Sequence, residues 1–307
     1  KCSLAEASLA PARATIAHRH NGTEEIYYFT AGYGKMSVEG KWTAVKAGDA
    51  VLIPAGSAHK LVNTGRTVMR LLCVCAPPYS HKDTEFAEPR FKLVVFDFDG
   101  TLVDTAPGIH ATANAMAKLY GEHPVSMAKV TAEVGTGLDN FVTGIFPAQV
   151  RELGVDSVIR TYRRIYDEKY CVGLRLFPGV KRALSGLKRR GITLAIVSNK
   201  LKRYVADINR RLGIEKYFSA VLGSDCVKRK KPDPYPVNLL MKKYGADRRE
   251  TLLVGDSKYD MEAGYRAGVA KFFLTYGYAV RKEAEKWKPD FVSGSFADVL
   301  KVVSWKQ

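Results

Sequence analysis

The chain has 307 residues, enough for two domains of ordinary size, and its hydrophobic fraction of 46% is typical of globular proteins. No apolar run approaches the roughly 20 residues that span a bilayer, so we expect no membrane partner. The net charge of +17 favours anionic partners. Because the basic residues are spread along the chain, without a basic arm or a nucleic-acid-binding motif, we expect a solvated basic surface and no nucleic acid partner.

The cysteine content indicates a reducing environment. The chain has five cysteines, which are Cys2, Cys73, Cys75, Cys171 and Cys226. An odd number without CxxC spacing argues against a disulfide framework or a zinc knuckle, so we expect a cytoplasmic protein. No basic-then-apolar signal peptide is visible. Because the chain begins with Lys1 rather than Met, it stays open whether upstream residues are missing.

Residues 1–86 form one glycine-punctuated block. Short strands are predicted over residues 25–30, 35–38, 50–54 and 68–75, with turn signals between them. This pattern predicts an antiparallel sandwich or barrel.

Histidines and one glutamate in this block are candidate metal ligands. His18 and His20 are two residues apart, so on a strand both imidazoles point to one face and can reach a common cation. With Glu25 and His59 they make a mixed nitrogen and oxygen set, which suits a divalent transition metal such as Mn, Fe, Ni or Zn. Surface histidines beside a turn explain the first pair equally well.

Two segments of the block resemble the signature motifs of the cupin family. The first is HxH, four residues, Glu, six residues and Gly, and the second runs from Gly48 through Pro54 and His59 to Asn63. The resemblance implies an all-β double-stranded β-helix barrel, with the metal ligands His18, His20, Glu25 and His59. Cupins include isomerases, dioxygenases, storage proteins and ligand sensors, so the reaction is not specified. Short cupins commonly dimerise, which suggests a homodimer through this domain.

A proline-rich and charged linker over residues 76–90 ends the first block, so we predict domains at 1–86 and 87–307. Helical patterns then alternate with apolar strands, which are predicted at 93–96, 193–197, 220–223, 251–254 and 271–274. Alternating strands and helices imply a parallel, doubly wound α/β sheet, in which ligands bind at the carboxyl ends of the strands.

The first of these strands ends at two carboxylates. Asp97 and Asp99 lie on one side of an extended strand end, where their repulsion is costly without a cation or a shared proton. An EF-hand loop starting at Asp97 is excluded, since its fifth, sixth and twelfth positions hold Thr101, Leu102 and Gly108. Asp is also common in turns, so one such residue alone would mean little.

Polar residues also follow two later strands. Ser198 and Asn199 can bond phosphate oxygens together with backbone N–H groups, although a helix N-cap explains them as well. Asp256 and Asp260 lie four apart at a helix start, where helix capping is the simpler alternative. Lys231 stands before two prolines in a basic run, and an ordinary surface lysine would look the same.

In chain order, the four segments begin at Asp97, Ser198, Lys231 and Asp256. Together they resemble motifs one to four of the haloacid dehalogenase-like hydrolases, and the resemblance runs from residue 91 to about 303. It implies a Rossmann-like α/β core in which Asp97 is the nucleophile that forms an aspartyl-phosphate. Asp99 matches the general acid, and later base, which argues for phosphoryl transfer over dehalogenation. The implied phosphate-binding residues are Thr101, Ser198, Asn199 and Lys231.

The same resemblance implies a Mg²⁺ site. Its ligands would be the Asp97 carboxylate, the backbone carbonyl of Asp99 and the Asp256 carboxylate, with Asp260 in support. Mg²⁺ explains how so many carboxylates share one site, and it stabilises charge on a transferring phosphoryl group.

Residues 105–175 resemble the family's helical cap, inserted between core segments 91–104 and 176–307. Helical patterns fill 108–120, 126–133 and 156–170, and such a cap closes over the site and excludes water. The loop 135–138 matches a substrate-contacting loop, although a turn between helices explains it equally well.

The cap and the first motif resemble the phosphoglycolate phosphatase-like branch, next to phosphomutases, pyrophosphatases and nucleotidases. We therefore expect an Mg²⁺-dependent phosphatase that hydrolyses a small phosphorylated metabolite, phosphoglycolate-like or a sugar phosphate. Two alternatives concern the cupin, which could be a separate isomerase or dioxygenase. It could also be a non-catalytic module for sugar or small-ligand sensing and dimerisation.

Overall fold

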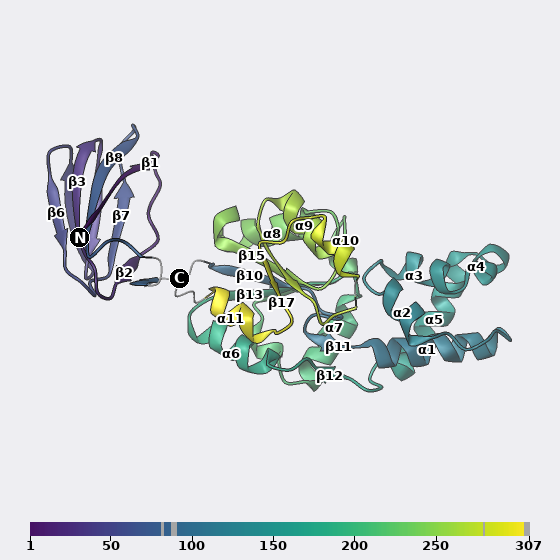
Figure 1. Cartoon of the computed structure of the whole chain (residues 1–307). Helices are drawn as coiled ribbons and strands as arrows, with labels where there is room; N and C mark the ends of the chain where they lie inside the picture. The colour runs from purple at the N-terminus through teal and green to yellow at the C-terminus, as the bar shows by residue number, and fades with distance from the viewer. Residues whose placement is uncertain (81–82, 87–90, 279, 304–307) are drawn as a thin grey trace. The chain divides into compact units, whose positions relative to one another are not determined.

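The computed structural model describes residues 1–80, 83–86, 91–278 and 280–303, and the chain folds as two compact units (Figure 1). The first unit covers Lys1–Arg90 and the second Phe91–Leu300. The predicted boundary after residue 86 adjoins residues 87–90, which lie outside the described residues.

Among its described residues, the first unit is built from two antiparallel sheets. One sheet has the strand order β1-β8-β3-β6, with β1 Ser3–Leu9, β8 Met69–Ala76, β3 Glu24–Ala31 and β6 Ala50–Ile53. The other has the order β5-β4-β7-β2-β9, with β5 Lys41–Lys46, β4 Tyr33–Val38, β7 His59–Asn63, β2 His18–His20 and β9 Thr84–Phe86. This architecture confirms the expected antiparallel sandwich or barrel.

The alternation of side chains along β3 shows how the sequence builds this domain. Tyr27 and Phe29 point inward and are buried in the core between the sheets, together with Met36 and Leu61. Their neighbours on β3 face outward, because successive side chains of a strand point to opposite sides. The predicted strands correspond to β3, β4, β6 and β8, and the sequence did not predict the others.

The second unit contains, among its described residues, a six-stranded parallel sheet of order β14-β13-β10-β15-β16-β17. The strands are β14 Ala220–Leu222, β13 Thr193–Val197, β10 Leu93–Phe96, β15 Thr251–Gly255, β16 Ala270–Leu274 and β17 Phe291–Ser293. All four residues of β10 are fully buried, as expected for the centre of a parallel sheet. The predicted parallel α/β sheet is confirmed, and β17 is an additional edge strand.

Helices cover both faces of this sheet (Figure 1). On one face lie α8 Tyr235–Tyr244 and α9 Lys258–Ala267, whose apolar residues pack on β10, β13 and β15. On the other face lie α6 Val180–Arg189 and α11 Ala297–Val303, where Phe296 stacks on Phe96. The other core helices are α7 Lys202–Arg211 and α10 Arg281–Glu285, with the 3₁₀ turns η2 Glu215–Tyr217, η3 Ser224–Cys226 and η4 Arg248–Glu250.

A helical insertion leaves the core after β11 Val103–Asp104 and returns at β12 Arg175–Leu176, and these two strands pair antiparallel. It comprises α1 Ala106–Leu119, α2 Met127–Glu133, α3 Leu138–Ile145, α4 Pro147–Leu153 and α5 Val155–Lys169. Met116, Val130, Val142 and Val158 are fully buried in a core of its own. This insertion lies where the cap was predicted, and α3 and α4 were not predicted.

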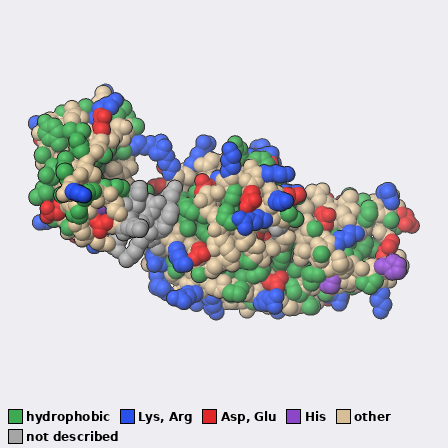
Figure 2. All heavy atoms as spheres, viewed as in Figure 1, with side chains coloured by type: hydrophobic (Ala, Val, Ile, Leu, Met, Phe, Trp, Pro, Cys, Tyr) green, Lys and Arg blue, Asp and Glu red, His purple; other side chains and the backbone are tan. Residues whose placement is uncertain are grey.

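The surface of the second unit carries many of the basic residues that give the chain its net charge of +17 (Figure 2). Lys and Arg side chains are scattered over the visible face of the second unit (Figure 2). None of the helices that the structure describes combines the length and the apolar character that crossing a bilayer demands.

Two adjacent leucines of α8 test the packing of the sheet. Leu240 is 1% exposed against the sheet, whereas Leu239 is 37% exposed. We expect Leu240→Ala to lower the free energy of unfolding by about 2 to 5 kcal/mol, because it leaves a cavity in the core. The matched change Leu239→Ala should cost less than about 1 kcal/mol. Urea unfolding followed by the helical circular dichroism signal measures both, and equal losses would contradict the assigned packing.

Candidate active site

The site lies at the carboxyl ends of β10, β13 and β15, where the first motif leaves the sheet. Asp97 directly follows β10, and its N–H donates to the carbonyl of Val254 on β15 at 2.9 Å. Gly100 has φ +83°, a conformation that favours glycine, and it turns the chain back toward Val103. The turn directly follows Asp97 and Asp99, and both residues line the cavity at this edge of the sheet.

Lys231 is buried between two of the predicted carboxylates. Its Nζ lies 2.6 Å from Oδ1 of Asp97 and 2.6 Å from Oδ1 of Asp260. Burial alone would lower the pKa of Lys231, but the carboxylates of Asp260 and Asp97 raise it above its ordinary value. Lys231 is therefore a permanent cation in a site that holds excess negative charge.

Asp256 is held on both of its carboxylate oxygens. Oδ1 accepts from the hydroxyl of Thr101 at 2.7 Å, and Oδ2 accepts from the N–H of Tyr278 at 2.8 Å. Burial, followed by the charge of Asp260, raises the pKa of Asp256 to about 7. The sequence did not single out Tyr278, because it lies outside the four motifs.

Three carboxylates of this site could hold a cation. Asp97, Asp256 and Asp260 each offer an oxygen within 4.8 Å of the others. Burial and the charge of Asp260 also raise the pKa of Asp97 well above its ordinary value. Glycines fit closely around Asp256, since a Cβ at Gly277 or at Gly100 would lie 2.2 or 2.4 Å from its Oδ2. These donors are all oxygen atoms, they are buried, and their negative charge exceeds the positive charge of Lys231. Such a site fits Mg²⁺.

Asp99 points away from these carboxylates and toward a second lysine. Its Oδ1 accepts from Nζ of Lys200 at 2.7 Å and from the hydroxyl of Thr105 at 2.5 Å. Among the described residues, its Oδ2 makes no hydrogen bond. The sequence motifs did not identify Lys200 or Thr105, although Lys200 directly follows Asn199. A carboxylate with one free oxygen beside the nucleophile position is suited to proton transfer.

The residues after β13 tie the core to the cap. Ser198 is buried, and its hydroxyl accepts from the N–H of Lys200 at 3.1 Å. The side-chain amide of Asn199 donates to the carbonyl of Gly135 in the cap at 2.8 Å and to that of Lys231 at 2.9 Å. This geometry gives the Asn199 side chain a bracing role, and its contact with phosphate stays a prediction.

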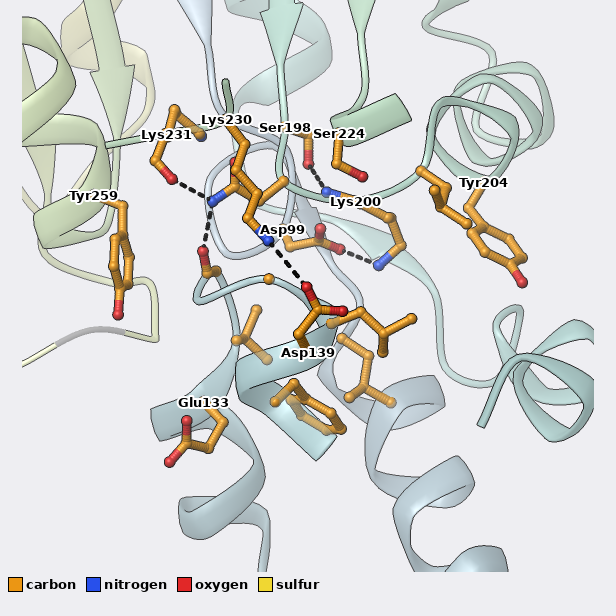
Figure 3. A pocket seen from close by; sticks show the side chains of 18 of the residues that line it. Asp99, Glu133, Asp139, Ser198, Lys200, Tyr204, Ser224, Lys230, Lys231 and Tyr259 are labelled. Carbon is orange, nitrogen blue, oxygen red and sulfur yellow. Dashed lines mark hydrogen bonds and ion pairs between the residues drawn. The ribbon is translucent and has the colours of Figure 1, made fainter. Parts of the chain in front are cut away.

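A cavity of about 400 Å³ lies over these residues, between core and cap (Figure 3). Asp97, Asp99, Ser198 and Lys231 line it on the core side. The cap contributes the predicted loop at Gly135 and Gly137, an apolar wall and the rim residue Asp139, which is 3.8 Å from Lys230. The wall residues include Ile109, Leu138, Phe141, Tyr162 and Tyr166. Leu138 belongs to the predicted loop 135–138, and the sequence did not predict the others because they meet only in the folded chain.

The first unit contains a separate cluster of potential ligands. His18, His20, Glu25 and His59 each offer an atom within 4.8 Å of the others. Oε2 of Glu25 lies 3.3 Å from Nε2 of His20 and 3.1 Å from Nε2 of His59. Strands β2, β3 and β7 therefore bring together all four residues that the sequence predicted as ligands.

Backbone contacts orient the imidazoles of this cluster. Nδ1 of His18 donates to the carbonyl of Ile16 at 2.8 Å, and Nδ1 of His59 donates to that of Ser57 at 3.1 Å. A neutral imidazole that donates from Nδ1 carries its lone pair on Nε2, the form that binds metals. Burial and the neighbouring His59 lower the pKa of His18 to about 4, so it is neutral near neutral pH.

The other two ligand positions have similar support. The hydroxyl of Thr84 donates to the carbonyl of Ser80 at 3.3 Å and can therefore accept from Nδ1 of His20 at 3.0 Å. Cys75 donates to Oε1 of Glu25 at 3.1 Å. Among the described residues, Nε2 of His20 and Oε2 of Glu25 are buried without a hydrogen bond. Buried nitrogen and oxygen atoms that face one another without a hydrogen bond fit a divalent transition metal.

Comparison with known proteins identifies a related family for each of the two units. The family model of the haloacid dehalogenase-like hydrolases matches residues 94–274, and that of the cupin domain matches residues 5–75. A phosphoglycolate phosphatase of Vibrio parahaemolyticus is 37% identical over 220 residues, which are 69% of this chain and 96% of the relative. One from Haemophilus influenzae is 34% identical over 221 residues, covering 70% of this chain and 99% of the relative.

The solved structures agree as well. The crystal structure of a predicted phosphoglycolate phosphatase from Haemophilus somnus has a TM-score of 0.65 and 34% identity, covering 69% of this chain and 98% of that one. These matches confirm the predicted hydrolase and the predicted fusion. The chain belongs to the haloacid dehalogenase-like hydrolase family and carries a cupin domain ahead of the hydrolase.

Proposed function

We propose that the second unit is an Mg²⁺-dependent phosphatase that hydrolyses a small phosphate ester, phosphoglycolate or one like it. The observation that carries this proposal is the placement of Asp97 against the buried cation Lys231, in a cavity that Asp99 also lines. The printed names of the relatives, phosphoglycolate phosphatases, support the substrate.

The proposed reaction has two displacement steps, first at the ester and then at the aspartyl-phosphate. The carboxylate of Asp97 attacks phosphorus, the bond from phosphorus to the ester oxygen breaks, and Asp99 gives a proton to the leaving alcohol. Asp99 then takes a proton from water, whose oxygen attacks phosphorus, so that phosphate leaves and the Asp97 carboxylate is restored. Lys231, Ser198 and backbone N–H groups after β13 offset charge on the phosphoryl oxygens.

A bound Mg²⁺ would be held by the carboxylates of Asp97 and Asp256 and by the backbone carbonyl of Asp99, with Asp260 in support. When bound, the ion would stabilise the negative charge on the phosphoryl oxygens during transfer. In the protein itself, Lys231 offsets part of the charge of Asp97 and Asp260. Thr101 and the N–H of Tyr278 keep the Asp256 carboxylate oriented.

Substitution of the nucleophile tests this assignment. We expect Asp97→Asn to lower kcat for phosphate release by at least about 1,000-fold with every substrate, because no aspartyl-phosphate can form. Asp156→Asn, on the exposed side of α5 in the cap, is the matched control and should keep wild-type turnover. Steady-state phosphate release in the presence of Mg²⁺ measures the turnover of both variants. Turnover retained by Asp97→Asn would contradict the proposal.

For the first unit, we propose a metal-binding module whose ligands are His18, His20, Glu25 and His59. The support is the convergence of buried Nε2 and carboxylate oxygen atoms whose other polar atoms are already hydrogen-bonded. Its metal ligands are separate from the carboxylates of the phosphatase site. This module would therefore keep its metal whether or not the phosphatase turns over.

Metal analysis of the full chain tests the module. We expect His59→Ala and His18→Ala each to weaken transition-metal binding by at least about 100-fold, because each removes a ligand. His123→Ala, an exposed histidine of the cap, is the control and should leave the metal content unchanged. Elemental analysis after dialysis reports the content, and phosphatase activity should be the same in all three variants. Unchanged metal in the first two variants would defeat the ligand assignment.

We also propose that the chain forms a homodimer through the outer face of the sheet β1-β8-β3-β6. Leu4, Val74, Ile26 and Leu52 are in register across its four strands, and Tyr28 lies in the adjacent row. Leu4 is 66% and Leu52 59% exposed. The four strands have 7, 8, 8 and 4 residues and cover roughly 430 Å² in projection, which is the area of a small, weak interface.

Charge favours a second copy as the occupant of this face. The charged residues on it are Glu6 and Arg70, which pair with each other at 3.3 Å, and Glu24 at the start of β3, so the face carries no excess positive charge. Two chains of net charge +17 repel each other least where a mainly apolar face without excess positive charge meets its copy. A two-fold contact would then use the same patch on both copies.

The double variant Ile26→Lys and Leu52→Lys tests this face, because it would place four like charges in a two-fold contact. We expect a dimer for the wild-type chain and a monomer for the variant in sedimentation velocity at micromolar concentration. Trp42→Lys, an exposed aromatic residue of the other sheet, is the control and should remain dimeric. A monomeric wild type, or a dimeric double variant of native circular dichroism, would contradict the proposal.

A reducing compartment, the cytoplasm, fits the proposed chemistry. All five cysteines are free thiols. Cys75 is one of them, and its thiol contacts the predicted ligand Glu25.

A further inference from the structure

Lys200 places a second cation in the phosphatase cavity. Its Nζ lies 2.7 Å from Oδ1 of Asp99 and 5.2 Å from the ring centre of Tyr166, and its side chain is only 10% exposed (Figure 3). Lys200 lines the same cavity as the predicted nucleophile Asp97. The proposed two-step reaction gives it no task, so its position requires another explanation.

The other cations that line the cavity have different positions. Lys231 is buried between Asp97 and Asp260, at the phosphoryl end. Lys230 is at the rim, 39% exposed, and Arg163 is exposed. Of these lining cations, Lys200 is the one in contact with the proposed general acid. It is therefore on the side where the leaving alcohol departs.

Distance restricts what Lys200 can contact. In its proposed role, on which this inference rests, Asp99 must bring its carboxylate within roughly 3 Å of the ester oxygen to give it a proton. Lys200 is 2.7 Å from Oδ1 of this carboxylate, and the two oxygens of a carboxylate are roughly 2.2 Å apart, so its ammonium lies within roughly 8 Å of that ester oxygen. In a phosphorylated 2-hydroxy acid, the carboxylate oxygens are roughly 3 to 4 Å from the ester oxygen. That spacing lets such a carboxylate form an ion pair with Lys200.

The surroundings strengthen an ion pair at this position. The ammonium faces the ring of Tyr166, which is 2% exposed and stacks on Tyr162 at 5.3 Å between ring centres. Aromatic rings on this side exclude water, which makes charge interactions stronger than at an exposed site. The cavity of about 400 Å³ leaves room for a substituent on the carbon next to the carboxylate.

From this geometry we infer that Lys200 binds the carboxylate of the substrate, and that the substrates are phosphate esters of 2-hydroxy acids. Phosphoglycolate is the smallest ester of this class, and a substituted member such as the phosphate ester of lactic acid also fits. Sugar phosphates do not place a carboxylate beside the ester oxygen and do not use this contact. Lys200 is thereby a specificity residue, distinct from the groups that transfer the phosphoryl.

Two substrates of equal length separate this role from a merely structural one. Phosphoglycolate carries the carboxylate, and 2-hydroxyethyl phosphate replaces it with a neutral hydroxymethyl group. We expect Lys200→Met to lower kcat/KM for phosphoglycolate roughly 10- to 100-fold, mainly through KM, because it removes a charged hydrogen bond. With 2-hydroxyethyl phosphate the same variant should change kcat/KM by less than about 3-fold. Lys200→Arg should restore part of the preference for phosphoglycolate.

The control is Lys202→Met, an exposed lysine at the start of α7, which should match the wild type with both substrates. Equal losses for the two substrates in Lys200→Met would show that Lys200 only positions Asp99, and would overturn the inference. A wild-type preference for a sugar phosphate over both phosphoglycolate and the phosphate ester of lactic acid would also overturn it. Either result leaves the proposed phosphatase standing, provided that Asp97→Asn still abolishes phosphate release.

Discussion

The buried ammonium of Lys231 between Asp97 and Asp260 is the interaction on which the phosphatase site depends. Burying three carboxylates close together is costly unless positive charge compensates them. The parallel sheet makes the arrangement possible, because the ends of β10, β13 and β15 meet at one edge and a helix begins soon after each. The close fit of Gly100 and Gly277 around Asp256 then leaves little room for that carboxylate to move away.

The sequence predicted the parts of this site that are encoded locally. Asp97 and Asp99 follow a short apolar strand, so their spacing indicated a common side, whereas the role of Asp256 and Asp260 at a helix start was implied by the resemblance to the family motifs. Lys200, Thr105 and Tyr278 could not be found this way. Each acts through a contact with a residue from another segment, which only the folded chain reveals. Lys200 is adjacent to a predicted residue, yet sequence gives no reason to expect its contact with Asp99.

The fold was predictable to a similar extent, and for a similar reason. Strands with strong alternation or continuous apolar runs, such as β3 and β10, were predicted. Strand β2, which has three residues, was not predicted, because so few residues show no hydrophobic period. The cupin ligands were nevertheless predictable, since the motif fixes their spacing. What the motif does not contain is their orientation, which comes from contacts such as Ser57 with His59 and Cys75 with Glu25.

The two candidate metal sites differ in a way that keeps them independent. The phosphatase site offers carboxylate oxygens, which suit the hard ion Mg²⁺, whereas three imidazoles and one carboxylate favour a transition metal. Because imidazole binds Mg²⁺ poorly and transition metals bind nitrogen ligands more tightly, we expect the two units to prefer different ions. The fusion therefore needs no shared ligand or shared ion. A link between the two units, through assembly or through a ligand of the cupin, would have to act on the phosphatase by another route than its metal.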